Sequence, residues 1–203
     1  MATGRSAVDI ANDALTHLGR SRITSLDDST EEARTMTQFI DGSIDAVLQD
    51  FPYNCARYLA QCSQLVATPA YGYNYQYQLP TDPYCLRVIH VKDQDAQYTW
   101  KRKGRAIHTD LTSCFIEYVG RTDAADLDAL VQNVVASYLA YRAAYALTKS
   151  NSKANEMFEL YTVDAERAQQ SDGLEGSTRI LTKSEIRTAR MQSRVTGWVG
   201  ATT

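Results

Sequence analysis

The side chains that most often carry catalysis or bind metals are few in this chain and widely separated. Zinc-binding cysteines usually occur in pairs about two to four residues apart, and metalloprotease histidines usually lie in an HExxH helix. Neither spacing occurs, so the sequence predicts no metal site, no catalytic residue and no enzyme. We expect the cysteines to be small buried hydrophobic residues and the histidines to be structural. The residues concerned are Cys55, Cys62, Cys85, Cys114, His17, His90 and His108.

Two short segments could suggest a ligand site. Residues 19–22 read Gly-Arg-Ser-Arg, but no strand precedes them, as a phosphate-binding loop would require. The acidic pairs at 27–28 and 31–32 could hold a cation, yet carboxylates at the start of a helix ordinarily complement the helix dipole. The sequence therefore predicts no cofactor.

Tyrosine is used heavily, with thirteen tyrosines against four phenylalanines and two tryptophans. Tyrosine covers a large area at low entropy cost and keeps a polar tip, so it is enriched at protein interfaces. Tyr71, Tyr73, Tyr75 and Tyr77 alternate with other residues and would present successive rings on one face of a strand. Two interpretations stay open, namely an interface with another subunit or tail protein and a sheet packed against helices.

The C-terminal residues differ electrostatically from the rest of the chain. Residues 174–203 contain five basic and two acidic side chains, a net charge of +3, so residues 1–173 carry −6 of the total of −3. The basic residues recur at intervals of three or four, which would place them on one face of a helix. This tail has few large apolar residues, so we expect it to order on binding a partner. Its basic residues are Arg179, Lys183, Arg187, Arg190 and Arg194.

Apolar residues at helical spacing predict two helices near the start and two near the end of residues 1–173. The first covers residues 6–18, and the second runs from a capping box, with Ser29 as N-cap and Glu32 as its partner, to Asp50. A third runs from a cap at Asp123 or Asp126 to Lys149, and a fourth covers residues 153–170.

The middle of the chain has the alternation typical of strands. Residues 73–79, 86–91 and 115–119 read as single strands, and residues 98–108 read as a hairpin around Gly104. Residues 53–70 fit either a helix or a strand. The predicted fold is therefore mainly α: a four-helix bundle core over residues 1–173, a small antiparallel β insertion at about 73–119, and an extended C-terminal arm over residues 174–203.

Several segments, taken in order, resemble the head-to-tail adaptor (connector) proteins of tailed bacteriophages, which include the tail tubular protein A of short-tailed phages. Residues 9–28 resemble the first helix and loop of that family, and residues 51–56 resemble its aromatic-Asn-x-Ala segment, with Tyr53 where tryptophan is commoner. The most specific match is the YxLPxDxLRV signature, seen here in residues 77–82 and 86–88 with residues 83–85 lengthening the gap. The match extends over residues 8–170.

The resemblance implies a structural virion protein with neither cofactor nor catalysis. It implies a homododecameric ring at the head–tail junction, assembled in host cytoplasm, which binds the portal protein above and a tail tube or nozzle protein below. Genomic DNA would pass through its channel without specific binding during genome ejection. By its position alone, the C-terminal segment 174–203 would be a portal-binding arm. The arm residues would be Arg179, Ile180, Lys183, Ile186, Arg187, Arg190, Met191 and Arg194.

Two alternatives come from other functional classes. The basic tail could serve a small DNA-binding or packaging-associated regulator, although the net charge of −3 disfavours a surface that binds nucleic acid throughout. A peptidoglycan-degrading enzyme would need a constellation of carboxylates or of His and Cys residues, which the spacing does not predict. The chain also lacks the apolar run of about 18–20 residues that a membrane span requires and an apolar leader at its start, so we expect a cytoplasmic protein.

Overall fold

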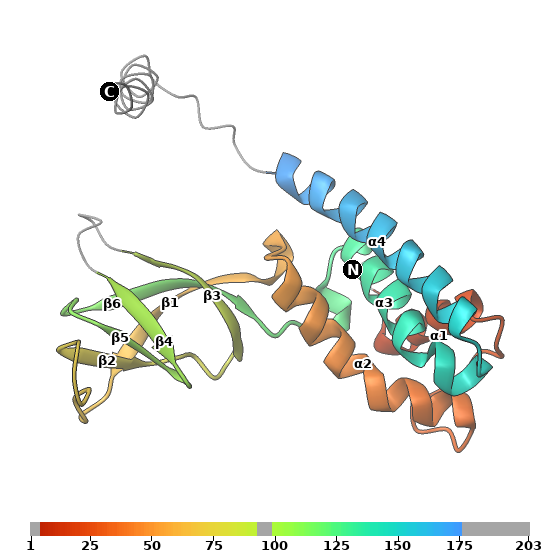
Figure 1. The fold of residues 1–203 in the computed structure, drawn as a ribbon, viewed down its shortest axis with the longest axis horizontal. Helices are drawn as coiled ribbons and strands as arrows, with labels where there is room; N and C mark the ends of the chain where they lie inside the picture. Colours follow the sequence, from red (N-terminus) through yellow and green to blue (C-terminus); the bar gives the residue numbers. More distant parts are fainter. Residues whose placement is uncertain (1–4, 93–98, 176–203) are drawn as a thin grey trace, which may run out of the picture. The chain divides into compact units, whose positions relative to one another are not determined.

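The computed structural model describes residues 5–92 and 99–175, and these residues form a helical part and a β-barrel part (Figure 1). The helices are α1 (Ala7–His17), α2 (Glu31–Asp50), α3 (Ala129–Thr148) and α4 (Asn151–Leu174), with short 3-10 turns at Asn54–Ala56 and Ala124–Asp126. The strands are β1 (Arg57–Gln64), β2 (Tyr75–Gln78), β3 (Cys85–Lys92), β4 (Trp100–Lys103), β5 (Ala106–Thr109) and β6 (Cys114–Gly120).

The first two helices lie where the sequence predicts them. Ser6 and Asp9 cap α1 reciprocally, because each side chain binds the backbone N–H of the other residue. The predicted cap of α2 is wrong by one residue. Thr30, rather than Ser29, is the N-cap, and its hydroxyl accepts a hydrogen bond from the Ala33 N–H at 3.2 Å.

The third and fourth helices are confirmed with shifted ends. Asp123 precedes a separate 3-10 turn, and α3 itself starts after its N-cap Asp128. Helix α4 continues to Leu174 through Gly173, beyond its predicted end at residue 170. Helix α3 has buried residues on every side, whereas only Met157, Ala165 and Ala168 of α4 are buried.

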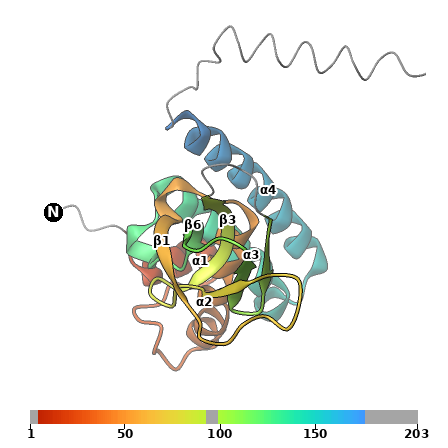
Figure 2. The ribbon, with the colours of Figure 1, turned by 90° about the vertical axis from the view of Figure 1, so that its left-hand side faces the viewer.

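The predicted fold class is wrong, because the described residues form a mixed α/β structure and not a helical bundle with a small β insertion. The six strands pair antiparallel in the order β3-β6-β1-β2-β5-β4 and curl into a nearly closed barrel (Figure 2). The ambiguous segment 53–70 supplies the missing piece, since β1 pairs with β6 over six residue pairs and with β2 at its far end. Without β1 the remaining strands would form two separate pieces of sheet.

Each part has its own hydrophobic core. One cluster of buried residues fills the space between the helices and includes Leu86 of β3 and Val119 of β6, where the strands meet the helices. The second lies inside the barrel and includes Tyr77, Tyr118, Ile107 and Ile116. At the junction, Arg87 of β3 donates hydrogen bonds to the last carbonyls of α2, at Gln49 and Asp50. Among the described helices, none is long and apolar enough to cross a membrane.

Candidate functional site

The three histidines considered for chemistry in the sequence are not brought together in the structure. His17, His90 and His108 lie on α1, β3 and β5, and the residues that the structure describes contain no group of three His, Cys, Asp or Glu side chains placed to hold a metal ion. Three of the cysteines are buried in the barrel core, where Cys62 of β1 lies directly opposite Cys114 of β6. Cys55 is half-buried beside the helices, and burial raises the pKa of its thiol to about 11, which keeps it protonated and weakly nucleophilic.

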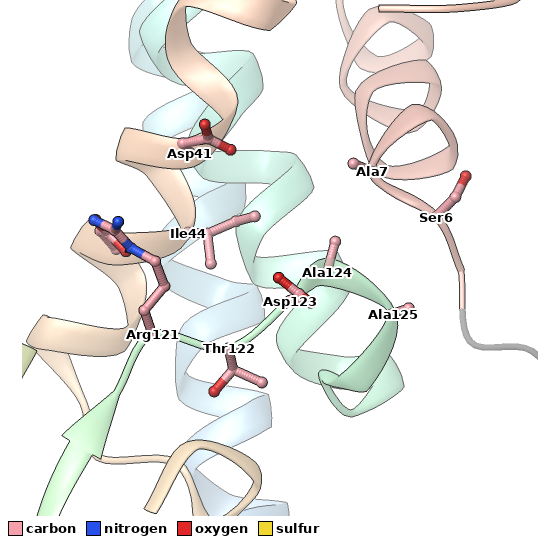
Figure 3. A pocket seen from close by; sticks show the side chains of 10 residues that line it. Ser6, Ala7, Asp41, Ile44, Arg121, Thr122, Asp123, Ala124 and Ala125 are labelled. Carbon is pink, nitrogen blue, oxygen red and sulfur yellow. The ribbon is translucent and has the colours of Figure 1, made fainter. Parts of the chain in front are cut away.

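A groove of about 500 Å³ lies where the start of α1, the middle of α2 and the connection after β6 meet (Figure 3). Arg121 extends from the end of β6 toward α2 (Figure 3). It pairs with Asp45 of α2, its Nε donating to Oδ1 at 2.9 Å. Hydrogen bonding to Asp45 raises the pKa of Arg121 and keeps it charged. Because this pairing satisfies the arginine, we interpret the groove as a joint between strand and helix.

The first of two exposed apolar surfaces considered within residues 5–92 and 99–175 lies between α3 and α4, and we call it the aromatic seam. Its residues are Tyr138, Tyr141, Tyr145, Phe158 and Tyr161. Ring centroids are 5.0 Å apart for Tyr138 and Tyr161 and 5.3 Å for Tyr141 and Phe158, as expected of tilted aromatic contacts. The hydroxyl of Tyr161 also donates to Asp50 at 3.1 Å. At the outer side of the seam, Tyr145 is 58% exposed and Phe158 is 48% exposed.

The second exposed apolar surface lies on the outside of the barrel, and we call it the barrel seat. It is a groove of about 440 Å³ on the outer face of β1, β6 and β3. Leu59 is 83% exposed and Phe115 is 43% exposed, so both apolar side chains face solvent. The residues that line the seat are Leu59, Ala60, Gln61, His90, Lys92, Phe115, Ile116 and Glu117.

The four tyrosines predicted to form one face of a strand do not all lie on one strand. Only Tyr75 and Tyr77 belong to β2, and Tyr77 is buried in the barrel core with its hydroxyl donating to the Leu111 carbonyl at 2.7 Å. Tyr73 contacts His108 edge-on, and Tyr71 is 78% exposed beneath the Lys103 ammonium group. Tyr71 therefore offers the largest exposed ring of the four, while Tyr77 stabilises the barrel from within.

Sequence reasoning missed both exposed surfaces. Tyr138, Tyr141 and Tyr145 recur at helical spacing on α3, and this regularity was the available signal for the aromatic seam. Nothing in the sequence marked Leu59 and Phe115, because the sequence alone does not distinguish an apolar strand residue that faces solvent from one that faces the core. All eight residues of the predicted portal-binding arm, 179–194, lie outside the described residues.

Several residues of the segments that carry the phage resemblance are buried or hydrogen-bonded within the fold. Leu79 is buried in the barrel core and Arg87 caps α2. Tyr53 is buried in the helical core, and the backbone N–H of Asn54 donates to the Asp172 carboxylate at 2.7 Å. A scan of known protein families finds no family model that matches the chain. A search of curated proteins also finds no match.

Proposed function

We propose that this chain is a non-enzymatic structural protein of a tailed bacteriophage, an adaptor that forms a ring between portal and tail. The ring would leave a channel for the genome and would support the tail tube or nozzle protein. The proposal joins the order of the resembling segments with one structural observation, which is the presence of two separate exposed apolar surfaces on one chain. Large exposed apolar patches on a folded protein ordinarily mark contacts with other proteins.

The two surfaces suit an assembly protein better than an enzyme. The aromatic seam and the barrel seat lie on different parts of the fold, and each exposes large apolar side chains, such as Phe158 and Leu59. A ring subunit needs two different surfaces, because each copy contacts one neighbour with one surface and the other neighbour with the second. The groove between α1, α2 and the connection after β6, in contrast, is lined by Arg121 and Asp45, which already pair with each other.

Binding to tail-less, DNA-filled heads tests the proposal. Purified chain mixed with such heads is expected to co-sediment with them and to retain their DNA, while empty procapsids without portal should bind none. Replacing Arg187, Arg190 and Arg194 with Glu is expected to prevent co-sedimentation, because these changes replace three of the five basic side chains of the arm with acidic ones. Failure of the unchanged chain to bind heads would overturn the adaptor function.

One observation favours the alternative of a DNA-binding regulator. Strand β4 places Lys101 and Lys103 on the outward side of the barrel, opposite His108 and Ala106 in the register, and Lys103 lies 4.9 Å from the ring centre of Tyr71. Basic and aromatic side chains on a small barrel can bind nucleic acid. Lysines on an edge strand also prevent unwanted strand pairing, which explains these residues without DNA.

The salt dependence of DNA binding separates the two functions. An adaptor is expected to bind duplex DNA weakly and without sequence preference, and deleting residues 174–203 should remove that binding. A regulator would bind tightly at physiological salt, and each neutralised phosphate would steepen the log–log salt dependence by about 0.9. Tight and sequence-selective binding would therefore replace the adaptor function with the regulator.

A further inference from the structure

We propose that the aromatic seam of one subunit docks into the barrel seat of the next, which makes these two surfaces the contact between neighbouring copies. This inference rests on the proposed ring-forming function and deepens it by naming the residues that meet. It concerns only surfaces within the described residues 5–92 and 99–175.

The register of the strands shows that the seat faces outward. Leu59 pairs with Glu117, and Gln61 pairs with Phe115, so these four side chains share the side of β1 and β6 that faces away from the barrel core. Their neighbours Ala60 and Ile116 point inward, toward the barrel core. The seat therefore offers Leu59 and Phe115 as an apolar floor that the barrel itself does not cover.

The opposite edge of the seat is basic. His90 pairs with Glu117 and Lys92 pairs with Phe115 on β3, so the imidazole and ammonium groups lie on the outward side beside the apolar floor. The carboxylate of Glu117 is already bound by Arg57, through the guanidinium Nε at 2.8 Å. Within the described residues, Lys92 is an exposed positive charge next to Phe115, so a complementary surface should present a carboxylate beside an apolar group.

The seam meets that requirement. Phe158 packs at a tilted angle against Tyr141 and Tyr161, at centroid distances of 5.3 Å and 6.1 Å, so its ring is held in place before any partner arrives. A preordered aromatic ring loses little conformational entropy on binding. Glu159 follows Phe158 directly and is exposed, and it can approach Lys92 when Phe158 enters the seat.

The shapes and charges of the two surfaces favour a second copy of the chain as the occupant. The two surfaces are unlike each other, one built of protruding rings and the other of a groove with an apolar floor, so they fit a head-to-tail contact better than a symmetric dimer. The charges next to them, Glu159 and Lys92, have opposite sign. A contact of this kind repeats from copy to copy and closes into a ring when the rotation permits.

Site-directed disulfide formation tests the contact directly. The single variants Leu59→Cys and Phe158→Cys are purified separately, mixed in the presence of portal, and oxidised with copper phenanthroline, which accepts the electrons as two thiols become a disulfide. A bond requires β-carbons about 4 Å apart. We expect disulfide-linked dimers in the mixture and not in either variant alone. A double variant with both Leu59→Cys and Phe158→Cys should give a series of larger disulfide-linked oligomers.

Charge variants provide a second readout with a matched control. Phe158→Glu and Leu59→Glu each place an unpaired carboxylate in an apolar contact, so each should raise the concentration needed for assembly by at least about 100-fold. Val163→Glu is the control for Phe158→Glu, because Val163 is 61% exposed on the same helix but five residues away, roughly 140° around the axis. Val66→Glu is the corresponding control for Leu59→Glu, since Val66 is fully exposed beyond the end of β1. Both controls should assemble normally.

The other outcomes overturn the inference in distinguishable ways. Disulfide-linked dimers from either single variant alone would indicate a symmetric contact between copies. A disulfide between positions 59 and 158 within one chain of the double variant would show that the two surfaces meet inside one subunit. Normal rings without the 59–158 crosslink would disprove this contact while leaving the adaptor function intact. Failure of the unchanged chain to assemble, even with portal, would contradict both the proposed contact and the adaptor function.

Discussion

Arg121 at the end of β6 and Asp45 in α2 form a two-pronged ion pair that joins the strand to the helix. The guanidinium Nε donates to Oδ1 at 2.9 Å, and one terminal nitrogen donates to Oδ2. The arginine side chain is 54% exposed and the aspartate 20% exposed, so water screens the attraction only in part. The pair fixes where the chain leaves the barrel and re-enters the helical part.

A double-mutant cycle on this pair should give a coupling energy of about 0.5–1 kcal/mol, measured as the change in the free energy of unfolding in urea. The variants are Arg121→Ala, Asp45→Ala and their combination. The pair Lys153–Glu156 on α4 serves as the comparison, because it is an exposed i,i+3 pair and should couple by only about 0.2–0.5 kcal/mol. Equal coupling in both cycles would mean that the pair at Arg121 has no special role.

The corrected cap of α2 gives a second prediction. Thr30→Ala should lower the free energy of unfolding by about 1 kcal/mol, because the hydroxyl that accepts from the Ala33 N–H is lost. Ser29→Ala should change the free energy of unfolding by less than about 0.5 kcal/mol. The reverse order of effects would restore the capping box that the sequence predicts.

Mutation of two tyrosines from the same predicted cluster should change the free energy of unfolding by very different amounts. Tyr77→Phe should cost about 1 kcal/mol, because the partly buried Leu111 carbonyl loses its donor, and Tyr77→Ala should cost about 3–5 kcal/mol. Tyr71→Ala, at an exposed position, should stay within about 0.5 kcal/mol of the unchanged protein. Thermal unfolding followed by circular dichroism would show this contrast, and similar losses for both residues would contradict it.

Alkaline pH should destabilise the helical core through Tyr53. Burial, with the nearby carboxylates of Asp50 and Asp172, raises the pKa of Tyr53 from 10.0 to about 12. Between these values the unfolded chain gives up the proton first, so the stabilisation is complete below pH 10 and is lost as the pH rises toward 12. Tyr53→Phe should therefore lessen the loss of stability between pH 10 and pH 11.5 by about 1 kcal/mol.

Some dependence on alkaline pH should remain in Tyr53→Phe, because burial also raises the pKa of Tyr77, Tyr118 and Tyr161. The measurement is urea unfolding at a series of pH values, with the variant compared with the unchanged protein at each one. Identical pH profiles would show that the Tyr53 hydroxyl titrates alike in the folded and unfolded chains.

The helices were predictable because their signals are local. Ser6 and Asp9 cap α1 within four residues, and Pro52 follows the end of α2, so neither boundary depends on distant partners. The hairpin around Gly104 was found for the same reason, since glycine adopts the left-handed backbone there, with φ of 57°.

The barrel was underestimated because β1 has no strong local pattern. Along Arg57–Gln64 only Cys62 is fully buried, and the polar residues Gln61, Ser63 and Gln64 hide the alternation. Its strand conformation depends on pairing with β6, whose residues lie more than fifty positions away in sequence. The candidate surfaces were missed for a related reason, since the exposure of Phe158 or Leu59 depends on which neighbours cover it.

The mass of the native protein, measured with and without purified portal, tests the ring-forming adaptor most directly. The subunit has a mass of 22.7 kDa, so a ring must appear as an integral multiple of that value, added to the mass of the portal when both are present. We expect a portal-bound ring of about twelve copies, and Phe158→Glu should abolish it while Val163→Glu does not. A chain that stays monomeric at all concentrations and does not associate with portal would contradict the adaptor function.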